Sequence, residues 1–423
     1  MITYDDLLKI DEENIIILLN TIIDLTSYVF FIIFFSNNFK NKYDKITKNL
    51  LFCIQDSGPV FIKYFQILAS KRYTINFKDK KIIDTLEIFS KLEDNVLISD
   101  NIKKKELEII KYFKNIRLIN TKPLGIGSIA SVYNIKYNNK NAVIKIVHPG
   151  IEDKINKGYI NLNLQIKMAS NMSSDVRKIN KLIDIHDIVS VIKIQTDMTL
   201  EGNNILIMNK IFKDDPVVKI PQIFFYSKKA IIMEKINGYK YYDFIIRFPE
   251  FQDEAIAAIF YTFKKMIINK CIHCDFHYGN FFIDIIDDKV IINLLDFGIV
   301  KYISDLDKEN FLVLFDFKSS EIDKIKAVLK FLWNLTKCKE KKSKFYSNYN
   351  DFEEKFLSTQ KIDNLELIDI INYLKKIDVK ISYYNSLLIN SLEFIFSIIN
   401  KTYLGTNKKF FYKFLLGYLF DIE

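Results

Sequence analysis

Two short polar segments in the second half of the chain contain the residue types that phosphate chemistry needs. In "HCDFHYGN", Asp275 and Asn280 stand five residues apart, and we expect His273 and His277 to shape this segment by hydrogen bonding. In "LLDFG" an apolar run ends at Asp296, and Gly298 allows a sharp turn there. The first spacing suits an irregular loop that presents a carboxylate to a hydroxyl group and an amide oxygen to a metal ion. Asp296 would be a hard oxygen ligand for Mg²⁺ beside phosphate. We therefore expect Asp275 to act on a hydroxyl, and Asn280 and Asp296 to bind Mg²⁺.

A glycine-containing loop and an isolated lysine precede these segments. In "PLGIGSIASVY", Gly125 and Gly127 lie between two strand-like halves, where the missing side chains would let backbone N–H groups approach a polyphosphate. Lys145 stands in the otherwise apolar strand "NAVIKI" and needs an anionic partner there, such as a phosphate or a carboxylate. Each feature alone is weak evidence, because a G-x-G turn also occurs in plain hairpins.

The order of the four clusters is more informative than any one of them. A glycine loop, a strand lysine, D-x-x-x-x-N and D-F-G follow one another as in the phosphoryl-transfer set of protein-kinase-like folds. This order predicts ATP and Mg²⁺ as ligands.

The elements that must position these clusters are both helical and extended. With 11 glycines and 6 prolines among 423 residues, the chain is poor in helix breakers, which excludes collagen-like, disordered and turn-dense all-β proteins. The patterns predict an α+β, bilobal, kinase-like fold with a helical N-terminal extension and a helix-rich C-lobe. Helices are expected over 103–119, 151–208, 253–270 and 304–423, and strands within 123–147 (around the turn "KYNNKN"), 220–240 and 281–296.

Four segments follow from this layout. They are an acidic start with a hydrophobic helix (1–50), a helical extension (51–120), an N-lobe (121–235) and a C-lobe (236–423). Residues 15–35 are long enough to cross a bilayer, but Asn20 and Asp24 lie near the centre of that stretch. Either a membrane anchor or a buried helix fits. The acidic start opposes a signal or transit peptide, so we expect a cytoplasmic protein or one facing the cytoplasm from a membrane.

Charge and cysteine content exclude two other classes. The formal charge is +9, but the basic residues are nearly all scattered lysines and no arginine cluster appears, so we expect no nucleic-acid partner. Cys271 and Cys274 form a C-x-x-C without a second pair, which argues against a zinc site.

Further segments make the resemblance to kinase-like folds specific to one family. "SGPVFIKYFQILASKRY" resembles the K-x-G-Q signature of the ABC1 family, also called UbiB or AarF-domain atypical kinases, with Lys63 and Gln66 on its Lys and Gln. "IKIVHPGI" resembles the family's Lys strand and following turn, and "HCDFHYGN" and "LLDFG" resemble its catalytic segments. The match runs from about residue 56 to 316. "QTDMTLEGNN" resembles the family's E-x-D…E…N segment, with Gln195, Asp197, Glu201 and Asn204 on its polar positions.

The resemblance implies a role for each matching residue. Lys145 would hold the α- and β-phosphates and pair with Glu201, Asp275 would be the catalytic aspartate, and the extension would cover the place where a peptide substrate would bind. The nucleotide contacts implied are Gly125, Ile126, Gly127, Ser128, Val132 and Lys145, with Met233, Glu234 and Ile236 at the adenine, and Asn280 and Asp296 would hold the metal.

The implied activity is ATP binding with ATP hydrolysis or phosphate transfer linked to ubiquinone-type or other isoprenoid lipids, with an acceptor that the sequence does not identify. Several positions depart from the family. Phe65 replaces the K-x-G-Q glycine, Gln195 replaces the E-x-D glutamate, and Phe276 and Tyr278 replace prolines. Glycines also stand where the family loop is alanine-rich. These departures suggest a less restrained active site.

Two alternatives remain. A pseudokinase scaffold that binds a nucleotide or lipid partner without turnover is favoured by Gln195 and Phe65, but not by the intact Asp275, Asn280 and Asp296. A small-molecule kinase like the aminoglycoside and choline kinases shares the H-x-D-x-x-x-x-N loop but not the K-x-G-Q-like segment.

Overall fold

The computed structural model divides the chain into two compact units. The first holds the described residues up to Met198 together with Phe225–Ile232, and the second holds Thr199–Phe224 and the described residues from Met233 onward. The structure describes residues 51–70, 89, 92, 96, 98–172, 184–316, 319–335, 349–359, 385, 387–392, 394, 395 and 398. Segment 15–35 lies outside them. Among these described residues, no helix combines the length and the apolar character that a membrane crossing requires.

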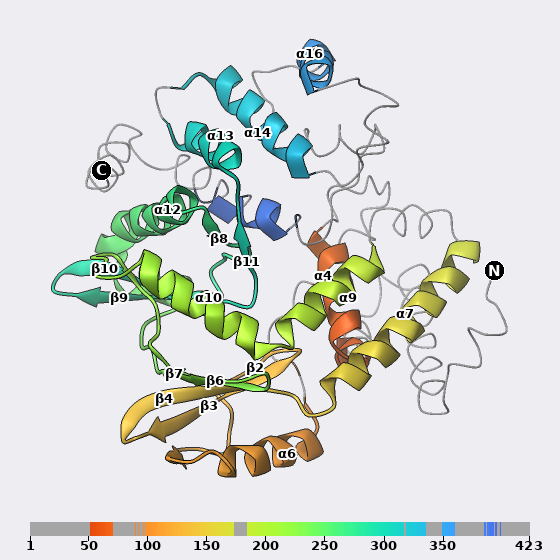
Figure 1. Cartoon of the computed structure of the whole chain (residues 1–423), viewed down its shortest axis with the longest axis vertical. Helices are drawn as coiled ribbons and strands as arrows, with labels where there is room; N and C mark the ends of the chain where they lie inside the picture. The colour runs from red at the N-terminus through yellow and green to blue at the C-terminus, as the bar shows by residue number, and fades with distance from the viewer. Residues whose placement is uncertain are drawn as a thin grey trace, which may run out of the picture. The chain divides into compact units, whose positions relative to one another are not determined.

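The sheet of the first unit carries the glycine loop and the strand lysine (Figure 1). Its strand order is β1 (Ile116–Leu118), β3 (Ala130–Tyr137), β4 (Lys140–Val147), β7 (Ala230–Glu234) and β6 (Ile223–Tyr226), and β2 (Gly125–Ile126) pairs with β3. Asn138 and Asn139 join β3 to β4 with φ of 48° and 65°. Two such residues suit a tight hairpin turn, because asparagine tolerates positive φ. The predicted hairpin at "KYNNKN" is confirmed.

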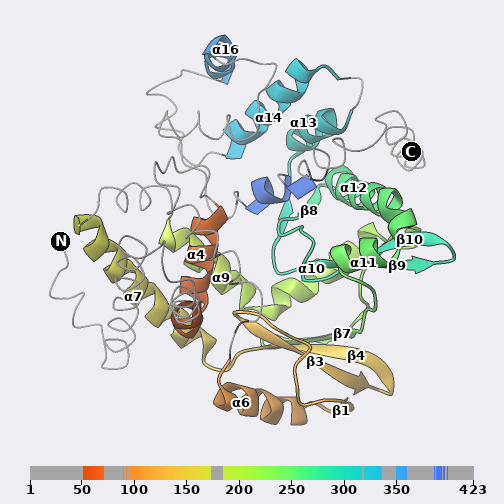
Figure 2. The ribbon, with the colours of Figure 1, turned by 180° about the vertical axis from the view of Figure 1, so that it is seen from behind.

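Helices flank this sheet in the first unit. α4 (Pro59–Ser70) packs against α7 (Ile151–Met172) and α9 (Ile185–Gln195), as Figure 2 shows. α6 (Asp100–Lys111) begins after Ser99, whose hydroxyl accepts a hydrogen bond from the Ile102 N–H. The predicted helix over 103–119 is wrong beyond Lys111, because Asn115 takes a φ of 64° and residues 116–118 pair with β3.

The predicted helix over 151–208 is likewise interrupted. α9 ends at Gln195, where the Thr196 N–H and hydroxyl both bond to the Lys193 carbonyl, and α10 (Met198–Ile211) begins three residues later. A longer α9 would use the Lys193 carbonyl as the acceptor of the Asp197 N–H, but this carbonyl already accepts both bonds from Thr196. α10 carries the polar residues of the "LEGNN" segment as a separate helix.

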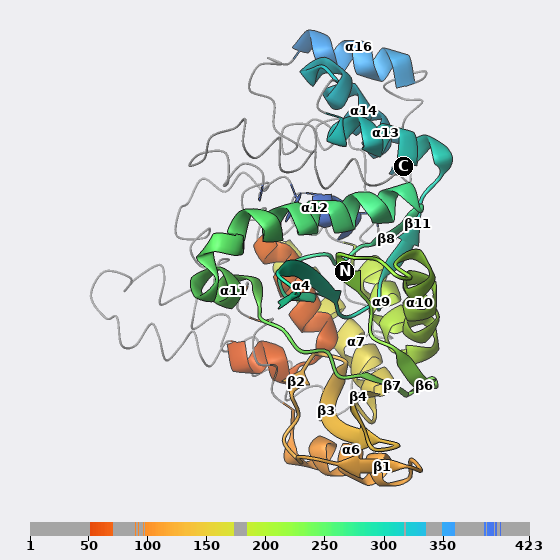
Figure 3. The same ribbon diagram turned by 90° about the vertical axis from the view of Figure 1, so that its left-hand side faces the viewer.

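Short strands and long helices build the second unit. β10 (Lys289–Leu294) pairs with β9 (Phe281–Ile286) and with β5 (Val218–Lys219), and β8 (Cys271–His273) pairs with β11 (Val300–Tyr302). α12 (Gln252–Ile268) is buried along most of its length and contacts both β8 and β10. It lies beside α13 (Asp305–Phe315), as Figure 3 shows. This unit also contains α11 (Tyr241–Arg247), α14 (Glu321–Leu335) and α16 (Tyr349–Thr359).

One buried carboxylate fastens β5 to α12. The Asp215 side chain, fully enclosed, accepts hydrogen bonds from the Val217 and Val218 N–H groups at 2.8 Å each and from the Tyr261 hydroxyl at 2.9 Å, and it pairs with the Lys265 ammonium. Since β5 pairs with β10, this carboxylate supports the strand that leads to Asp296.

We expect Asp215→Ala to destabilise the second unit by about 3–5 kcal/mol, because it leaves two backbone N–H groups and a largely buried ammonium without their acceptor. Trp333, the single tryptophan, lies on α14 of this unit, so urea unfolding followed by its fluorescence measures the loss. The matched control is Asp214→Asn at the neighbouring exposed position, where φ is 55° and asparagine fits; it should change stability by less than about 0.5 kcal/mol. Equal stability of Asp215→Ala and the control would contradict this account.

Candidate functional site

In the first unit, three sequence-predicted residues lie in one row across the sheet. Gly125 of β2 faces Val132 of β3, and Val132 faces Lys145 of β4. Directly opposed residues of antiparallel strands project to the same face, and neighbouring strands are about 4.8 Å apart. The side chains of Val132 and Lys145 therefore stand next to each other, within about 10 Å of the glycine loop.

The tip of the β2–β3 hairpin is formed by Ser128 and Ile129. The hairpin is closed by the Gly127 N–H, which donates to the Ala130 carbonyl at 2.9 Å, and by the Leu124 N–H, which donates to the Val132 carbonyl at 2.7 Å. A Cβ built on Gly125 would meet no atom within 4 Å, and one on Gly127 would meet only the Ala130 carbonyl at 3.4 Å. An alanine would thus fit at Gly125, as in the family's usual loop, and the hairpin bonds hold this loop in place.

In the second unit, α10 holds the backbone of the D-F-G segment. Glu201 is buried and its Oε1 accepts a hydrogen bond from the Phe297 N–H at 3.4 Å, while the Asn204 amide donates to the Phe297 carbonyl at 2.8 Å. One turn of α10 therefore fixes both polar groups of one residue. The pairing of Glu201 with Lys145 stays a prediction, because these residues belong to different units.

The segment expected to be catalytic, residues 273–280 and called the catalytic loop below, brings Asp275, His277 and Asn280 together. The Asn280 amide nitrogen donates to the Asp275 carbonyl at 2.8 Å and to its carboxylate at 3.2 Å, and His277 Nε2 lies 3.5 Å from the other carboxylate oxygen. Because the amide nitrogen of Asn280 bonds to Asp275, the amide oxygen is the atom that this side chain could offer to a metal ion.

Asn280 is also linked to the neighbourhood of Asp296. The Leu295 N–H donates to the Asn280 carbonyl at 2.8 Å, so the two expected Mg²⁺ ligands lie on adjoining backbone segments. Their amide and carboxylate oxygens are the ligand types that fit Mg²⁺. Among the residues that the structure describes, no group of three His, Cys, Asp or Glu could hold a metal by itself.

The turn of the D-F-G segment occurs at Asp296. Its φ is 32°, and its carboxylate accepts a hydrogen bond from the Gly298 N–H at 3.0 Å, whereas Gly298 itself does not have a positive φ. Aspartate tolerates this region because its short side chain can bond to the local backbone. Residue pattern alone placed the sharp turn at Gly298, and that expectation is wrong.

His273 connects the two loops. Its Nδ1 accepts a hydrogen bond from the Asp275 N–H at 3.2 Å, so the proton is on Nε2, which donates to the Asp296 carbonyl. Burial lowers the pKa of this imidazole, against smaller opposing effects of Asp275 and Asp296. The neutral tautomer that these bonds require is therefore the favoured form. The expectation that His273 and His277 shape the catalytic loop by hydrogen bonding is confirmed.

An aromatic cluster under the catalytic loop was not expected from the sequence. Phe276 is buried, and its backbone N–H donates to the Ser391 hydroxyl at 3.1 Å, a bond that a proline could not form. Tyr278 stacks on Tyr241 with ring centroids 4.1 Å apart and meets Phe394 edge-on at 4.6 Å. The residues that replace the family prolines are thus packed and hydrogen-bonded.

The thiols of Cys271 and Cys274, beside this loop, are buried. Burial raises the pKa of Cys271 to about 11 and that of Cys274 to about 12, so both thiols remain protonated at neutral pH.

The remaining predicted residues lie on the extension helices and the connector. Lys63 and Gln66 are on α4, Gln195 ends α9, and Asp197 precedes α10. Phe65, at the family's glycine position, is buried against Phe89 with centroids 4.7 Å apart. The buried amide oxygens of Gln66 and Gln195 have no hydrogen-bond partner among the described residues. Of the residues expected at the adenine, Met233 and Glu234 end β7 and Ile236 follows this strand. The Glu234 N–H donates to the Gln222 carbonyl at 2.8 Å.

Comparisons with known proteins place the chain in a family. The family model of the ABC1 atypical kinase-like domain matches residues 95–328. "Probable protein kinase UbiB" of Pseudomonas fluorescens (strain SBW25) is 25% identical over 250 residues, which cover 56% of this chain and 45% of that protein. The protein of the same name from Azotobacter vinelandii is 25% identical over 246 residues, 55% of this chain and 44% of the relative. The chain thus spans less than half the length of these relatives.

Among solved structures, one titled "The complex structure of Rv3197-erythromycin from Mycobacterium tuberculosis" resembles the chain with a TM-score of 0.41 and 16% identity. The match covers 78% of this chain and 86% of the chain in that structure.

The buried imidazole makes stability depend on pH in a defined direction. Because the folded-state pKa of His273 is lowered, its contribution is fully present above the unfolded value of about 6.5 and is lost as the pH falls below it. We expect the stability advantage of wild type over His273→Phe to shrink between pH 7.5 and 5, by at most roughly 1.4 kcal/mol per pH unit. Urea unfolding at each pH measures this difference.

His186 provides the matched control for that series. It is an exposed histidine on α9, so His186→Phe should follow the wild-type pH curve. A constant stability difference between wild type and His273→Phe across this range would contradict the role given to the neutral imidazole.

Proposed function

The chain belongs to the ABC1 atypical kinase-like family, and we therefore propose that it binds ATP with Mg²⁺ and either hydrolyses the nucleotide or transfers its terminal phosphate. The observation that carries the proposal is the arrangement of Asp275, Asn280 and Asp296. Three acidic or amide side chains from two separate segments are joined through backbone and side-chain hydrogen bonds, with Leu295 and His273 as the connecting residues. A merely structural loop has no need of this concentration of carboxylate and amide oxygens.

In the first unit, the proposal assigns phosphate contacts to the hairpin tip and the strand lysine. The backbone of Gly125, Ile126, Gly127 and Ser128 would approach the phosphates, and Lys145 would neutralise part of their charge. Val132, which stands beside Lys145 in the cross-strand row, would provide an apolar contact to the nucleotide. Met233, Glu234 and Ile236 would meet the adenine.

In the second unit, the proposal assigns the metal to Asn280 and Asp296. Bound Mg²⁺ would supply charge neutralisation for the phosphate oxygens. Asp275 would orient the attacking hydroxyl or water and accept its proton. The Asn280 amide nitrogen and His277 hold the Asp275 carboxylate from two directions, which limits its rotation before any acceptor arrives.

For the acceptor, we propose a lipid-linked or isoprenoid hydroxyl compound, with the protein acting at a cytoplasmic membrane surface. The support is the family and the matched relatives, each named a probable protein kinase UbiB. The extension residues Lys63 and Gln66, on the well-buried helix α4, would act as part of a cover over the acceptor site.

Nucleotide binding can be tested by thermal shift with ATP and Mg²⁺. Wild type should gain about 2.7 kcal/mol of stability at a ligand concentration 100 times Kd, and Lys145→Ala and Asp296→Asn should each lose most of the shift. The matched controls are Lys140→Ala on the same strand and Asp288→Asn in the exposed β9–β10 turn, which should keep it. A wild type without any ATP-dependent shift would refute the nucleotide-binding function.

Turnover requires a separate measurement. We expect Asp275→Asn to retain ATP binding but to lower the rate of phosphate release by roughly 100-fold or more, because the amide cannot accept the hydroxyl proton. The rate would be followed with and without vesicles that contain isoprenoid alcohols, and stimulation by those vesicles would support the proposed acceptor class. Wild-type binding without hydrolysis or transfer would instead favour the scaffold alternative.

A further inference from the structure

A buried carboxylate on α6 has two specific partners that the proposed chemistry does not use. Glu106 is fully enclosed, and its Oε1 lies 2.6 Å from Nδ1 of His148. Its Oε2 accepts a hydrogen bond from the Tyr133 hydroxyl at 2.7 Å. Burial raises the pKa of Tyr133, and Glu106 raises it further, so this hydroxyl stays protonated and keeps donating. A buried polar group of this kind is stable only where its hydrogen-bond partners are fixed.

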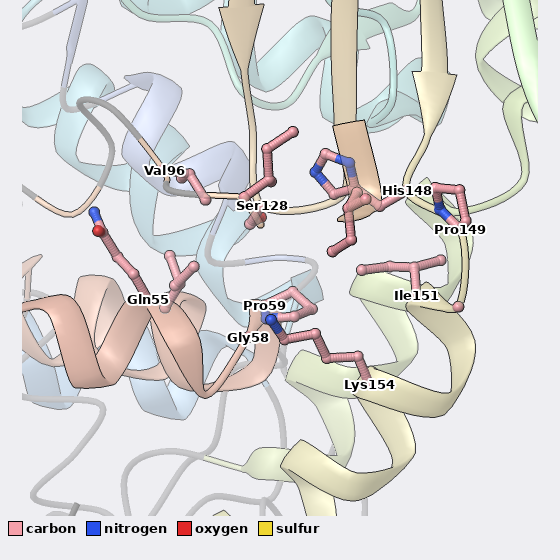
Figure 4. Close-up of a pocket in the computed structure, with 13 residues that line it drawn as sticks. Gln55, Gly58, Pro59, Val96, Ser128, His148, Pro149, Ile151 and Lys154 are labelled. Carbon is pink, nitrogen blue, oxygen red and sulfur yellow. The ribbon is translucent and has the colours of Figure 1, made fainter. Parts of the chain in front are cut away.

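The other side of the His148 ring faces the glycine loop. Its Nε2 lies 2.9 Å from the Gly127 carbonyl, and its backbone N–H donates to the Ile129 carbonyl at 2.9 Å. His148 therefore holds both carbonyl groups that flank Ser128. Figure 4 shows His148 and Ser128 along the same side of a pocket whose opposite side is formed by Gly58 and Pro59.

The distances determine where the protons are. A backbone carbonyl only accepts, so Nε2 of His148 must carry a proton. Nδ1 and the Glu106 oxygen are close enough that a second proton must lie between them. With one nitrogen bonded to Glu106 and the other to Gly127, the ring cannot rotate without losing both bonds.

This fixed ring determines the direction of one amide group. In a trans peptide, the N–H of a residue points opposite to the preceding carbonyl. No cis peptide occurs among the described residues. Because the Gly127 carbonyl points at His148, the N–H of Ser128 points away from it.

We propose that His148 is a positioning residue of the nucleotide loop, which aims the Ser128 N–H at a phosphate of the bound nucleotide, and that Glu106 on α6 locks the imidazole for this task. The proposal rests on the nucleotide-binding function proposed above. It adds α6, which contributes no contact to the nucleotide itself, to the elements that set phosphate affinity. His148 acts only through the loop, and the adenine end of the nucleotide does not depend on it.

The test separates the loop contact from the buried charge. Glu106→Gln is the reference background, because the amide can donate to Nδ1 of a neutral His148 and still accept from Tyr133; we expect its Kd for ATP to stay within about twofold of wild type. Adding His148→Leu in this background removes the bond to Gly127 and leaves no buried charge unpaired. We expect the Kd for ATP and ADP to rise about tenfold, the effect of one lost orienting hydrogen bond, and the Kd for adenosine to stay the same.

A second variant tests the same amide without altering the buried network. Ser128→Pro removes the N–H together with the hydroxyl, and Ser128→Ala, which removes the hydroxyl alone, is its control; glycine precedes the residue, so the chain can accommodate the ring. Ser128→Pro should weaken ATP and ADP binding by a similar factor and spare adenosine. Calorimetric titration of each ligand gives the values, with His186→Leu as the matched histidine control and circular dichroism confirming that each variant is folded.

The results distinguish this proposal from the function on which it rests. Absence of ATP binding by wild type would refute the nucleotide-binding function and this proposal with it. If wild type binds ATP and both the double variant and Ser128→Pro bind it equally well, the positioning role is overturned. Equal losses for ATP and adenosine would also overturn it, because they would mean a general disturbance of the unit.

Discussion

The imidazole of His273 is the interaction on which the proposed catalytic residues depend. Its Nδ1 accepts a hydrogen bond from the Asp275 N–H and its Nε2 donates one to the Asp296 carbonyl. A single ring thus holds two loops that follow separate strands. Each such bond contributes only about 1 kcal/mol net, but a buried group left without its partner costs about 1–3 kcal/mol. α10 completes this arrangement, since Glu201 and Asn204 fix the residue after Asp296. The aspartates are thereby held through their backbones, in addition to the hydrogen bonds that their carboxylates accept from Asn280 and Gly298.

Much of the candidate site could be predicted because its signals are local. The spacing of Asp275 and Asn280, the apolar run before Asp296 and the lysine in the apolar strand can each be recognised within a few residues. The hairpin around Asn138 was predictable for the same reason, since its turn depends on two adjacent residues. Membership of the ABC1 family and the mixed helical and stranded, kinase-like fold are also confirmed. The short strands β1, β5, β8 and β11 were missed, because a strand of two or three residues has no periodicity of its own and exists only through its partner.

The interactions that could not be predicted join residues far apart in the chain. Glu106 meets His148 across 42 residues, Glu201 meets Phe297 across 96, and Phe276 meets Ser391 across 115. A glutamate in an amphipathic helix looks like a surface residue, and only the folded chain shows that Glu106 is enclosed. The position of the turn was missed for a different reason. Glycine is the usual residue at positive φ, but a carboxylate that accepts a hydrogen bond from the backbone N–H two residues later makes the same conformation accessible to Asp296.

The bond between Phe276 and Ser391 changes how the catalytic loop obtains its rigidity. Proline restricts a backbone covalently, in the unfolded chain as well as in the folded one, so it lowers the entropy lost on folding. Phe276 and Tyr278 restrict the same backbone only after Ser391 and Phe394 have docked. Order in the loop therefore depends in part on residues more than a hundred positions downstream. Heat or denaturant that loosens those downstream residues would disorder the loop while the strands on either side of it remain paired.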